Sequence, residues 1–198
     1  ELIKSLLSNL PGRTGVIFPT FEEYPNRRKR EELEIFHPDN DDFTYTADDL
    51  ISFFSDRNIA SLILINPDNP TGNFIERPDL LRLAAWATDK GIRLVVDESF
   101  VDFADSESPG TLLEQQLLVR YPHLIVVKSI SKSYGVPGLR LGVAASGDEN
   151  LIRAMKEDVA IWNINSFAEY YMQIFEKYRT DYDNAMMRFR EVRRAYVR

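Results

Sequence analysis

The sequence predicts an α/β fold with a mostly parallel sheet and helices on both faces, and three observations lead to this class. Six short apolar runs alternate with helical patterns; the runs cover residues 15–19, 32–36, 61–67, 92–99, 123–130 and 139–146. Several runs are apolar on successive residues, which is typical of strands buried on both faces. Helical windows separate them, and this alternation favours parallel strands joined by helices.

The clearest helical window covers residues 78–90. Pro78 suits the first turn, where its missing amide hydrogen costs nothing, and Gly91 can end the helix. The side chains that follow helical spacing between them are Leu80, Leu81, Ala84, Ala85 and Thr88.

The pattern from Asn165 to the end predicts one long helix. A largely aromatic stripe steps by three and four: Ala168, Tyr171, Phe175, Tyr178, Tyr182, Ala185, Phe189, Val192 and Tyr196. Such a stripe is not an ideal coiled-coil seam, so we expect it to pack against the same chain or a further domain. No Gly or Pro closes the pattern, and we expect the sequence to be cut from a longer polypeptide.

Composition excludes several kinds of site. The chain has 198 residues and no cysteine, which removes thiolate nucleophiles, disulfides and cysteine-bound zinc, and its two histidines argue against a metal site. The net charge of −7 argues against a nucleic-acid partner, and we interpret the basic run at 26–30 as a solvated turn. No stretch approaches the roughly 20 apolar residues of a membrane span and no signal peptide is evident, so we expect a cytoplasmic protein.

Polar residues follow three of the apolar runs. The segment NPDNPTG comes at 66–72, DESF at 97–100 and KSISKSYGVPG at 128–138. In an open α/β sheet, ligands bind beyond the carboxyl ends of the strands. One edge of the predicted sheet therefore offers an amide, a carboxylate, hydroxyls and an amine.

Each of these segments also has a purely structural interpretation. The segment at 66–72 can be a simple turn, Asp97 can cap a helix, and Lys132 can be a solvated loop lysine. The glycines at 135, 138 and 142 match neither the dinucleotide fingerprint nor the P-loop, so those nucleotide sites are not indicated.

Taken together and in order, the three segments resemble a known family. NPDNPTG, VVDESF and SISKSYGVPGLRLG are similar to the motifs of the pyridoxal-phosphate enzymes of fold type I, in particular the class I/II aminotransferases. Within that family the nearest resemblance is to histidinol-phosphate aminotransferases and threonine-phosphate decarboxylases. The match spans Pro19 to Gly142, and WNINSFAE at 162–169 extends it.

The resemblance implies a role for each matching residue. Lys132 would form the Schiff base with the aldehyde of pyridoxal 5′-phosphate, and Asp97 would face the pyridine nitrogen and keep it protonated. Asn69 would hydrogen-bond the 3-oxygen of the ring, and its bond to Pro70 is a candidate cis peptide. The remaining cofactor-binding residues would be Phe21, stacked on the ring, and Ser129, Ser131 and Arg140, which would hold the phosphate.

One position departs from the family pattern. Three residues after Asp97 the family commonly has a tyrosine whose hydroxyl helps the 3-oxygen, whereas this chain has Phe100, which cannot donate. Together with WNIN, the segment DESFVDF favours the threonine-phosphate decarboxylase branch.

The resemblance also implies how the chain is organised. Residues 1–164 would be an incomplete large, cofactor-binding domain, and 165–198 a helix leading to a small domain that lies beyond Arg198. The family's loop that binds the cofactor phosphate at a helix N-terminus would precede Glu1, so we expect these 198 residues alone to be inactive or poorly active.

Several functions remain open at this point. The leading hypothesis is an aminotransferase that moves an amino group from an amino acid or phosphorylated amine to a 2-oxo acid, as a homodimer, without nucleic-acid or membrane partners. The alternatives are decarboxylation of a phosphorylated amino acid, a non-catalytic aminotransferase-like sensor domain, and a plain dimerisation fragment.

Overall fold

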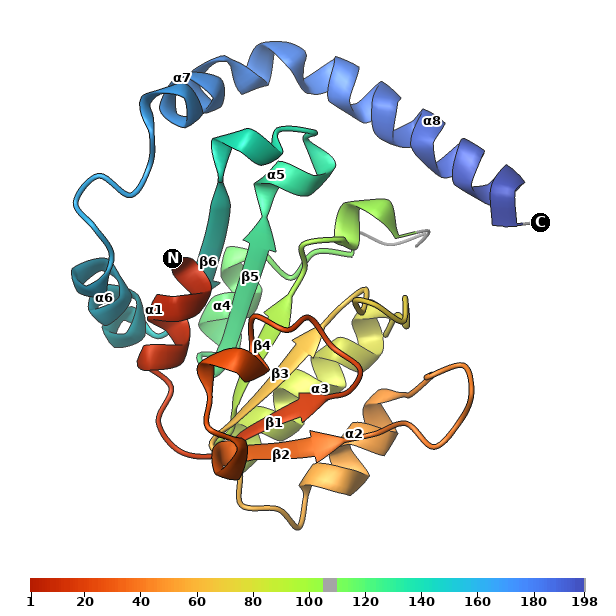
Figure 1. The fold of residues 1–198 in the computed structure, drawn as a ribbon, viewed down its shortest axis with the longest axis vertical. Helices are drawn as coiled ribbons and strands as arrows, with labels where there is room; N and C mark the ends of the chain where they lie inside the picture. Colours follow the sequence, from red (N-terminus) through yellow and green to blue (C-terminus); the bar gives the residue numbers. More distant parts are fainter. Residues whose placement is uncertain (105–109, 198) are drawn as a thin grey trace.

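A computed structural model describes residues 1–104 and 110–197, and one mixed sheet forms its centre (Figure 1). Five neighbouring strands are parallel, and the sixth pairs antiparallel at one edge. In spatial order the strands are β2 (Leu33–Phe36), β1 (Thr14–Ile17), β3 (Ser61–Ile65), β4 (Arg93–Asp97), β5 (Leu124–Ser129) and β6 (Gly142–Ser146). Each strand lies within or beside one of the six predicted apolar runs, and the predicted mostly parallel sheet is confirmed.

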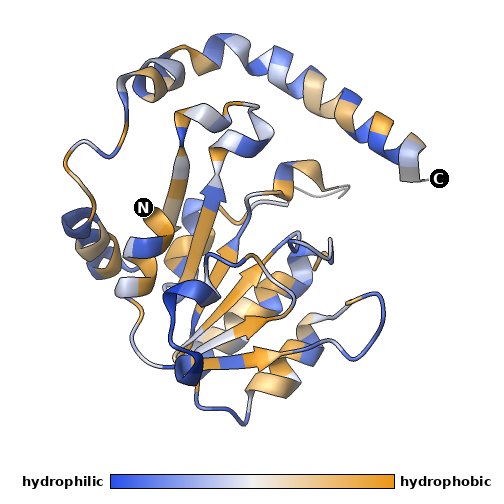
Figure 2. Cartoon of the chain, in the orientation of Figure 1, coloured by the Kyte–Doolittle hydropathy of each residue, from blue (hydrophilic) through white to orange (hydrophobic). Residues whose placement is uncertain are grey.

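Helices cover both faces of the sheet, as the sequence predicts. On one face, α2 (Ala47–Phe54) and α3 (Arg77–Lys90) bury their apolar sides in one core cluster, and α4 (Gln115–Arg120) packs at its margin. On the other face, α1 (Leu2–Ser8) and α6 (Glu149–Asp158) form a second cluster. In Figure 2 the central strands are largely hydrophobic, and the chain becomes polar where it leaves their carboxyl ends. Both faces are therefore buried, whereas the carboxyl edge remains available to polar groups.

Helix α3 begins and ends as the sequence predicts. Pro78 occupies its first turn, and Gly91 follows its last residue in the left-handed conformation with φ of 69°. This conformation lets the Gly91 amide donate back to Thr88 and Ala87, which closes the helix with little strain in a residue without a Cβ.

The prediction of one continuous helix after Asn165 is wrong in one respect. Asn165 caps α7 (Ser166–Ile174), a 3₁₀ turn η5 (Phe175–Tyr178) follows, and α8 (Arg179–Val197) completes the segment. Tyr134 contacts Phe175 edge-to-face at 4.6 Å and stacks on Tyr182 at 4.4 Å, both between ring centroids. The helix tightens into a 3₁₀ turn where the Tyr134 ring, from a distant segment, packs against it. The periodicity of the sequence alone does not reveal this contact.

The segment from α7 to α8 arches past the carboxyl ends of β4 and β5 (Figure 1). Part of its stripe packs against the same chain, because Phe189 lies 5.0 Å from Phe103 between ring centroids and Ala168 is fully buried. Val192 and Tyr196 remain exposed. The expectation of packing within the chain is thus confirmed for parts of the stripe between Ala168 and Phe189, and not for its last two members. Among the described helices, none is long and apolar enough to cross a membrane.

Substitution of Gly147 by alanine is expected to destabilise the fold. Gly147 links β6 to α6, and a Cβ there would lie 2.1 Å from the Leu118 carbonyl oxygen, so the backbone must shift. We expect a loss of about 1–3 kcal/mol in the free energy of unfolding, measured by urea denaturation. The matched variant Gly138→Ala meets no atom within 4 Å and should unfold near the wild-type midpoint. Equal midpoints for the two variants would contradict the close approach.

Candidate active site

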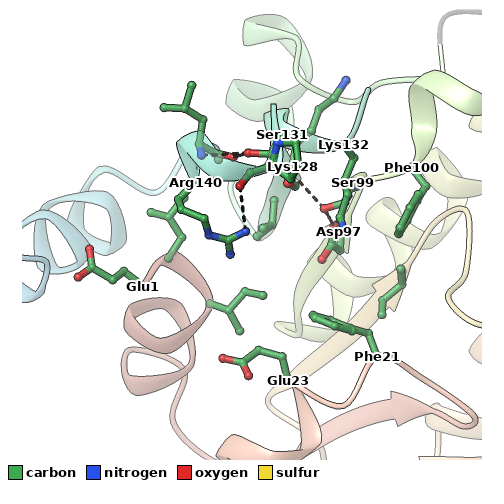
Figure 3. Close-up of a pocket in the computed structure, with 18 of the residues that line it drawn as sticks. Glu1, Phe21, Glu23, Asp97, Ser99, Phe100, Lys128, Ser131, Lys132 and Arg140 are labelled. Carbon is green, nitrogen blue, oxygen red and sulfur yellow. Dashed lines mark hydrogen bonds between the residues drawn. The ribbon is translucent and has the colours of Figure 1, made fainter. Parts of the chain in front are cut away.

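All seven residues that the resemblance singles out lie around one cavity of about 730 Å³ at the carboxyl edge of the sheet (Figure 3). They lie at or beyond the carboxyl ends of β1, β3, β4 and β5: Phe21, Asn69, Asp97, Ser129, Ser131, Lys132 and Arg140. Parallel strands place their carboxyl ends on the same side, which is why residues far apart in sequence meet there.

Asp97 ends β4 and is held by three hydrogen bonds. It is 4% exposed, and the buried Tyr24 hydroxyl donates to its Oδ2 at 2.7 Å. The Ser99 amide and hydroxyl donate to its Oδ1 at 2.9 and 2.5 Å. Sequence reasoning missed both Tyr24 and Ser99. In the sequence, Tyr24 lies near Phe21 and Ser99 lies near Asp97, but this proximity does not reveal the hydrogen bonds to the Asp97 carboxylate.

Two lysines line the cavity, and their surroundings differ. Lys128, at the end of β5, forms an ion pair of 2.7 Å with Asp102. Lys132 lies on the short helix α5 (Ile130–Ser133) rather than in a loop, and is exposed. Its Nζ lies 5.6 Å from the centre of the Phe100 ring. The ion pair engages the Lys128 amine, so Lys132 is the better placed of the two to react with a ligand.

The loop that carries Asn69 is held by its own side chains. The backbone amide of Asn69 donates to Asp68 Oδ1 at 2.8 Å, and the Thr71 hydroxyl donates to Asp68 Oδ2 at 2.6 Å. Burial raises the pKa of Asp68, and these two hydrogen bonds oppose the rise. The Asn69–Pro70 peptide is cis, which confirms the expected isomer.

The three residues expected at a phosphate differ in how their polar atoms are engaged. The Ser131 hydroxyl is buried, accepts from the Leu141 amide at 3.1 Å and donates to the Leu141 carbonyl at 3.3 Å. Arg140 is exposed, has φ of 56°, and donates from Nη1 to the Pro137 carbonyl at 3.4 Å. Ser129 lines the cavity, and its amide donates to Ser99 Oγ at 3.0 Å. Of the three side chains, that of Ser131 mainly fixes the chain entering β6.

Aromatic rings bound the cavity on two sides. Phe21 is 42% exposed and meets Tyr24 edge-to-face at 6.4 Å between ring centroids. Figure 3 shows Phe21 and Glu23 on one side, Arg140 on another, and Phe100 near Lys132 and Asp97. Within the described ranges, no group of three or more His, Cys, Asp or Glu side chains could hold a metal ion.

Glu98 is the neighbour of Asp97 and gives a testable pH dependence. Burial raises its pKa, while hydrogen bonds from the Thr111 hydroxyl and the Leu112 amide, and the charge of Lys128, oppose the rise. A carboxyl with a raised pKa contributes most to stability below the ordinary value of about 4.3, and this contribution is lost as the pH rises through the raised pKa. We therefore expect the melting temperature of the wild type to fall relative to Glu98→Gln as the pH increases from 4 to 7. Differential scanning fluorimetry across this range measures the difference, with the exposed Glu157→Gln as control. A difference independent of pH would contradict the expected titration.

Comparison with known proteins identifies the family. The model for aminotransferase class I and II matches residues 4–180, most of the chain. CMP-5′-(3-aminopropyl)phosphonate synthase of Streptomyces rubellomurinus is 35% identical over 193 residues, which are 96% of this chain and 30% of that protein. L-Serine phosphate decarboxylase of Sulfurospirillum multivorans is 32% identical and covers 100% of this chain and 50% of its own length. The chain thus spans about a third to a half of the length of these relatives.

A solved structure supports the fold. The histidinol-phosphate aminotransferase of Clostridium acetobutylicum aligns with a TM-score of 0.83 and 23% identity, covering 99% of this chain and 57% of that one. Relatives named threonine-phosphate decarboxylase and histidinol-phosphate aminotransferase also match, so the predicted resemblance is confirmed.

The residues around the cavity fit the family's cofactor, pyridoxal 5′-phosphate. They supply an amine on α5 for the aldehyde, a buried carboxylate for the ring nitrogen and an amide for the ring oxygen. They also supply an aromatic face for the ring and a guanidinium for the phosphate. On the match of the family model, the sheet and this cavity, the chain belongs to the class I and II aminotransferase family of pyridoxal-phosphate-dependent enzymes of fold type I.

Proposed function

We propose that the cavity binds pyridoxal 5′-phosphate through Lys132 and that the enzyme acts at the α-carbon of an amino acid with a phosphorylated side chain. The observation that carries the proposal is the convergence of Lys132, Asp97 and Asn69 on one cavity from three separate strand ends. When bound, the cofactor supplies a ring that accepts electrons from the α-carbon.

The residues of this chain divide the work by their chemistry. Lys132 holds the cofactor aldehyde and moves a proton at Nζ, for which its exposed position on α5 leaves access. Asp97 holds the ring nitrogen by charge, and Asn69 binds the ring oxygen. Arg140 binds the phosphate together with Ser129, at the end of β5, and Ser131, on α5. Phe21 packs on the ring and excludes water.

We propose decarboxylation as the reaction. The bond between the α-carbon and the carboxylate breaks, CO₂ leaves, and a proton replaces it, so an O-phosphorylated amino acid yields an O-phosphorylated amine. Two relatives named L-serine phosphate decarboxylase match along the whole of this chain, and a threonine-phosphate decarboxylase matches over 85% of it. Phe100, which lies beside Lys132, is the departure that favours this branch in the sequence.

Amino transfer is the second candidate, because the family model and the histidinol-phosphate aminotransferase relatives support it. In this reaction the substrate would lose its α-proton and its amino group and become a carbonyl compound, while a 2-oxo acid would receive the amino group and become an amino acid. The two reactions share the Lys132 site and differ in which bond at the α-carbon is broken.

Product analysis separates the two reactions. The full-length polypeptide that carries this chain, loaded with pyridoxal 5′-phosphate, is incubated with O-phospho-L-serine or O-phospho-L-threonine, and separately with histidinol phosphate plus 2-oxoglutarate. We expect CO₂ and the phosphorylated amine from the first mixture and no glutamate from the second. Glutamate formation without CO₂ release would replace decarboxylation by amino transfer, and turnover of neither mixture would remove both candidates.

We propose further that the active form is a homodimer. Ile161 and Trp162 are 96% and 93% exposed, and Phe167 on α7 is 79% exposed, while the adjoining Asn163 and Ile164 line the cavity. A second copy seated on this segment would bury apolar surface and complete one wall of the cavity. Sedimentation velocity should show a dimer that Trp162→Glu weakens, and a fully active monomer would contradict the proposal.

A further inference from the structure

The carboxylate of Asp97 is tied to the next strand by a single hydroxyl. Ser99 Oγ donates to Asp97 Oδ1 at 2.5 Å (Figure 3). The same oxygen accepts from the Ser129 backbone amide at 3.0 Å. The direction of these bonds follows from the chemistry of the groups. An amide can only donate and an ionised carboxylate can only accept, so the hydroxyl hydrogen must point to Asp97.

This contact is more than a local turn. The bond from the Ser99 amide to Asp97 spans two residues and is an ordinary turn of the backbone. The hydroxyl contact spans 30 residues and joins two strand ends. Backbone pairing between β4 and β5 reaches Asp97 with Val127, and the Glu98 amide donates to the Val127 carbonyl. Ser99 Oγ therefore extends the link between the two strands beyond the last backbone bond.

Tyr24 completes the arrangement from the other side. It is 1% exposed and donates to Asp97 Oδ2 at 2.7 Å. Burial, and then the charge of Asp97, raise the pKa of Tyr24 well above its usual value, so its hydroxyl stays a neutral donor. Each oxygen of Asp97 is thus held by a residue outside the sheet pairing, and the carboxylate cannot rotate without breaking both contacts.

We propose that Ser99 is a positioning residue that sets the distance and orientation of Asp97 relative to Ser129. It does so by carrying one hydrogen-bond chain from the Ser129 amide to the carboxylate, opposite Tyr24. This inference rests on the proposed function, in which Asp97 holds the ring nitrogen of the cofactor and Ser129 begins the segment that binds its phosphate. Ser99 itself need not touch the cofactor. Its effect is to keep Asp97, at the ring nitrogen, and Ser129, at the phosphate, at a fixed distance from each other.

Two variants of Ser99 and one control test the role. Ser99→Ala removes the hydroxyl, and Ser99→Thr keeps it. Ser146→Ala is the matched control, because Ser146 Oγ also bonds backbone groups, the Leu124 carbonyl and the Asp148 amide, but lies at the opposite end of β6. The readouts are hydrogen exchange of the Ser129 amide without cofactor, the dissociation constant for pyridoxal 5′-phosphate, and the pH dependence of the bound cofactor's absorbance.

We expect Ser99→Ala to accelerate exchange at Ser129, to weaken cofactor binding by about 10-fold and to shift the absorbance profile, since a hydrogen bond to a charged group is lost. Ser99→Thr should restore all three towards the wild type, and Ser146→Ala should lower thermal stability alone. If the wild type binds the cofactor through Lys132 but Ser99→Ala and Ser146→Ala have the same affinity and profile, the positioning role is wrong. If the wild type gives no Lys132-dependent signal, the proposed function itself fails.

Discussion

Replacement of Lys132 by alanine is expected to abolish the absorbance of the lysine-bound cofactor and to lower turnover by at least about 10³-fold. The reason is chemical, because no other group at this position can form the covalent link and move the proton. Lys132 is exposed on α5, so the fold should tolerate the change. The measurement is an absorbance titration with pyridoxal 5′-phosphate together with the product assay.

A matched pair of charge-conserving variants sharpens this test. Lys132→Arg keeps the positive charge but cannot form the link, and Lys128→Arg keeps the ion pair with Asp102. The exposed Lys156→Ala on α6 serves as a surface control. Loss of the signal in Lys128→Arg with retention in Lys132→Arg would show that the wrong lysine has been assigned.

Asp97→Asn is expected to lower turnover by about 10²–10³-fold while leaving the fold intact. Asparagine has the same shape, and its carbonyl oxygen can still accept from Tyr24 or Ser99, but it has no charge to hold a protonated ring nitrogen. Circular dichroism should therefore be unchanged while the rate falls.

A cofactor analogue with a permanently charged, N-methylated ring distinguishes charge from packing in this variant. If Asp97 acts by keeping the nitrogen charged, the analogue should recover part of the lost activity in Asp97→Asn and give no gain in the wild type. The exposed Asp158→Asn is the control. Equal rates for Asp97→Asn and Asp158→Asn would contradict the assigned role.

Much of the fold could be predicted from local pattern. Runs of apolar residues marked all six strands. The signal comes mainly from β1, β3, β4 and β5, which are largely buried and therefore favour apolar side chains on successive positions. Pro78 and Gly91 marked the ends of α3 through their backbone preferences. The turn at η5 could not be predicted in the same way, since the Tyr134 ring that packs there comes from a distant segment.

The candidate site was predictable for a related reason. Asn69, Asp97 and Lys132 each follow an apolar run, and parallel strands bring such positions to one edge. The supporting contacts were not visible. Tyr24 lies 73 residues from Asp97 and Ser99 lies 30 residues from Ser129, and neither pair carries a spacing or motif that links its members.

The sequence by itself determined the class of fold, the edge at which the site forms and the kinds of group that meet there. These properties follow from periodicity, backbone preference and the order of short motifs, all of which are local. Only the tertiary structure decided that Lys128 is engaged by Asp102 while Lys132 lies exposed at the cavity, and that Tyr24 and Ser99 hold Asp97 from both sides. Such choices depend on strand order and register, which set the distances between side chains that are far apart in the chain.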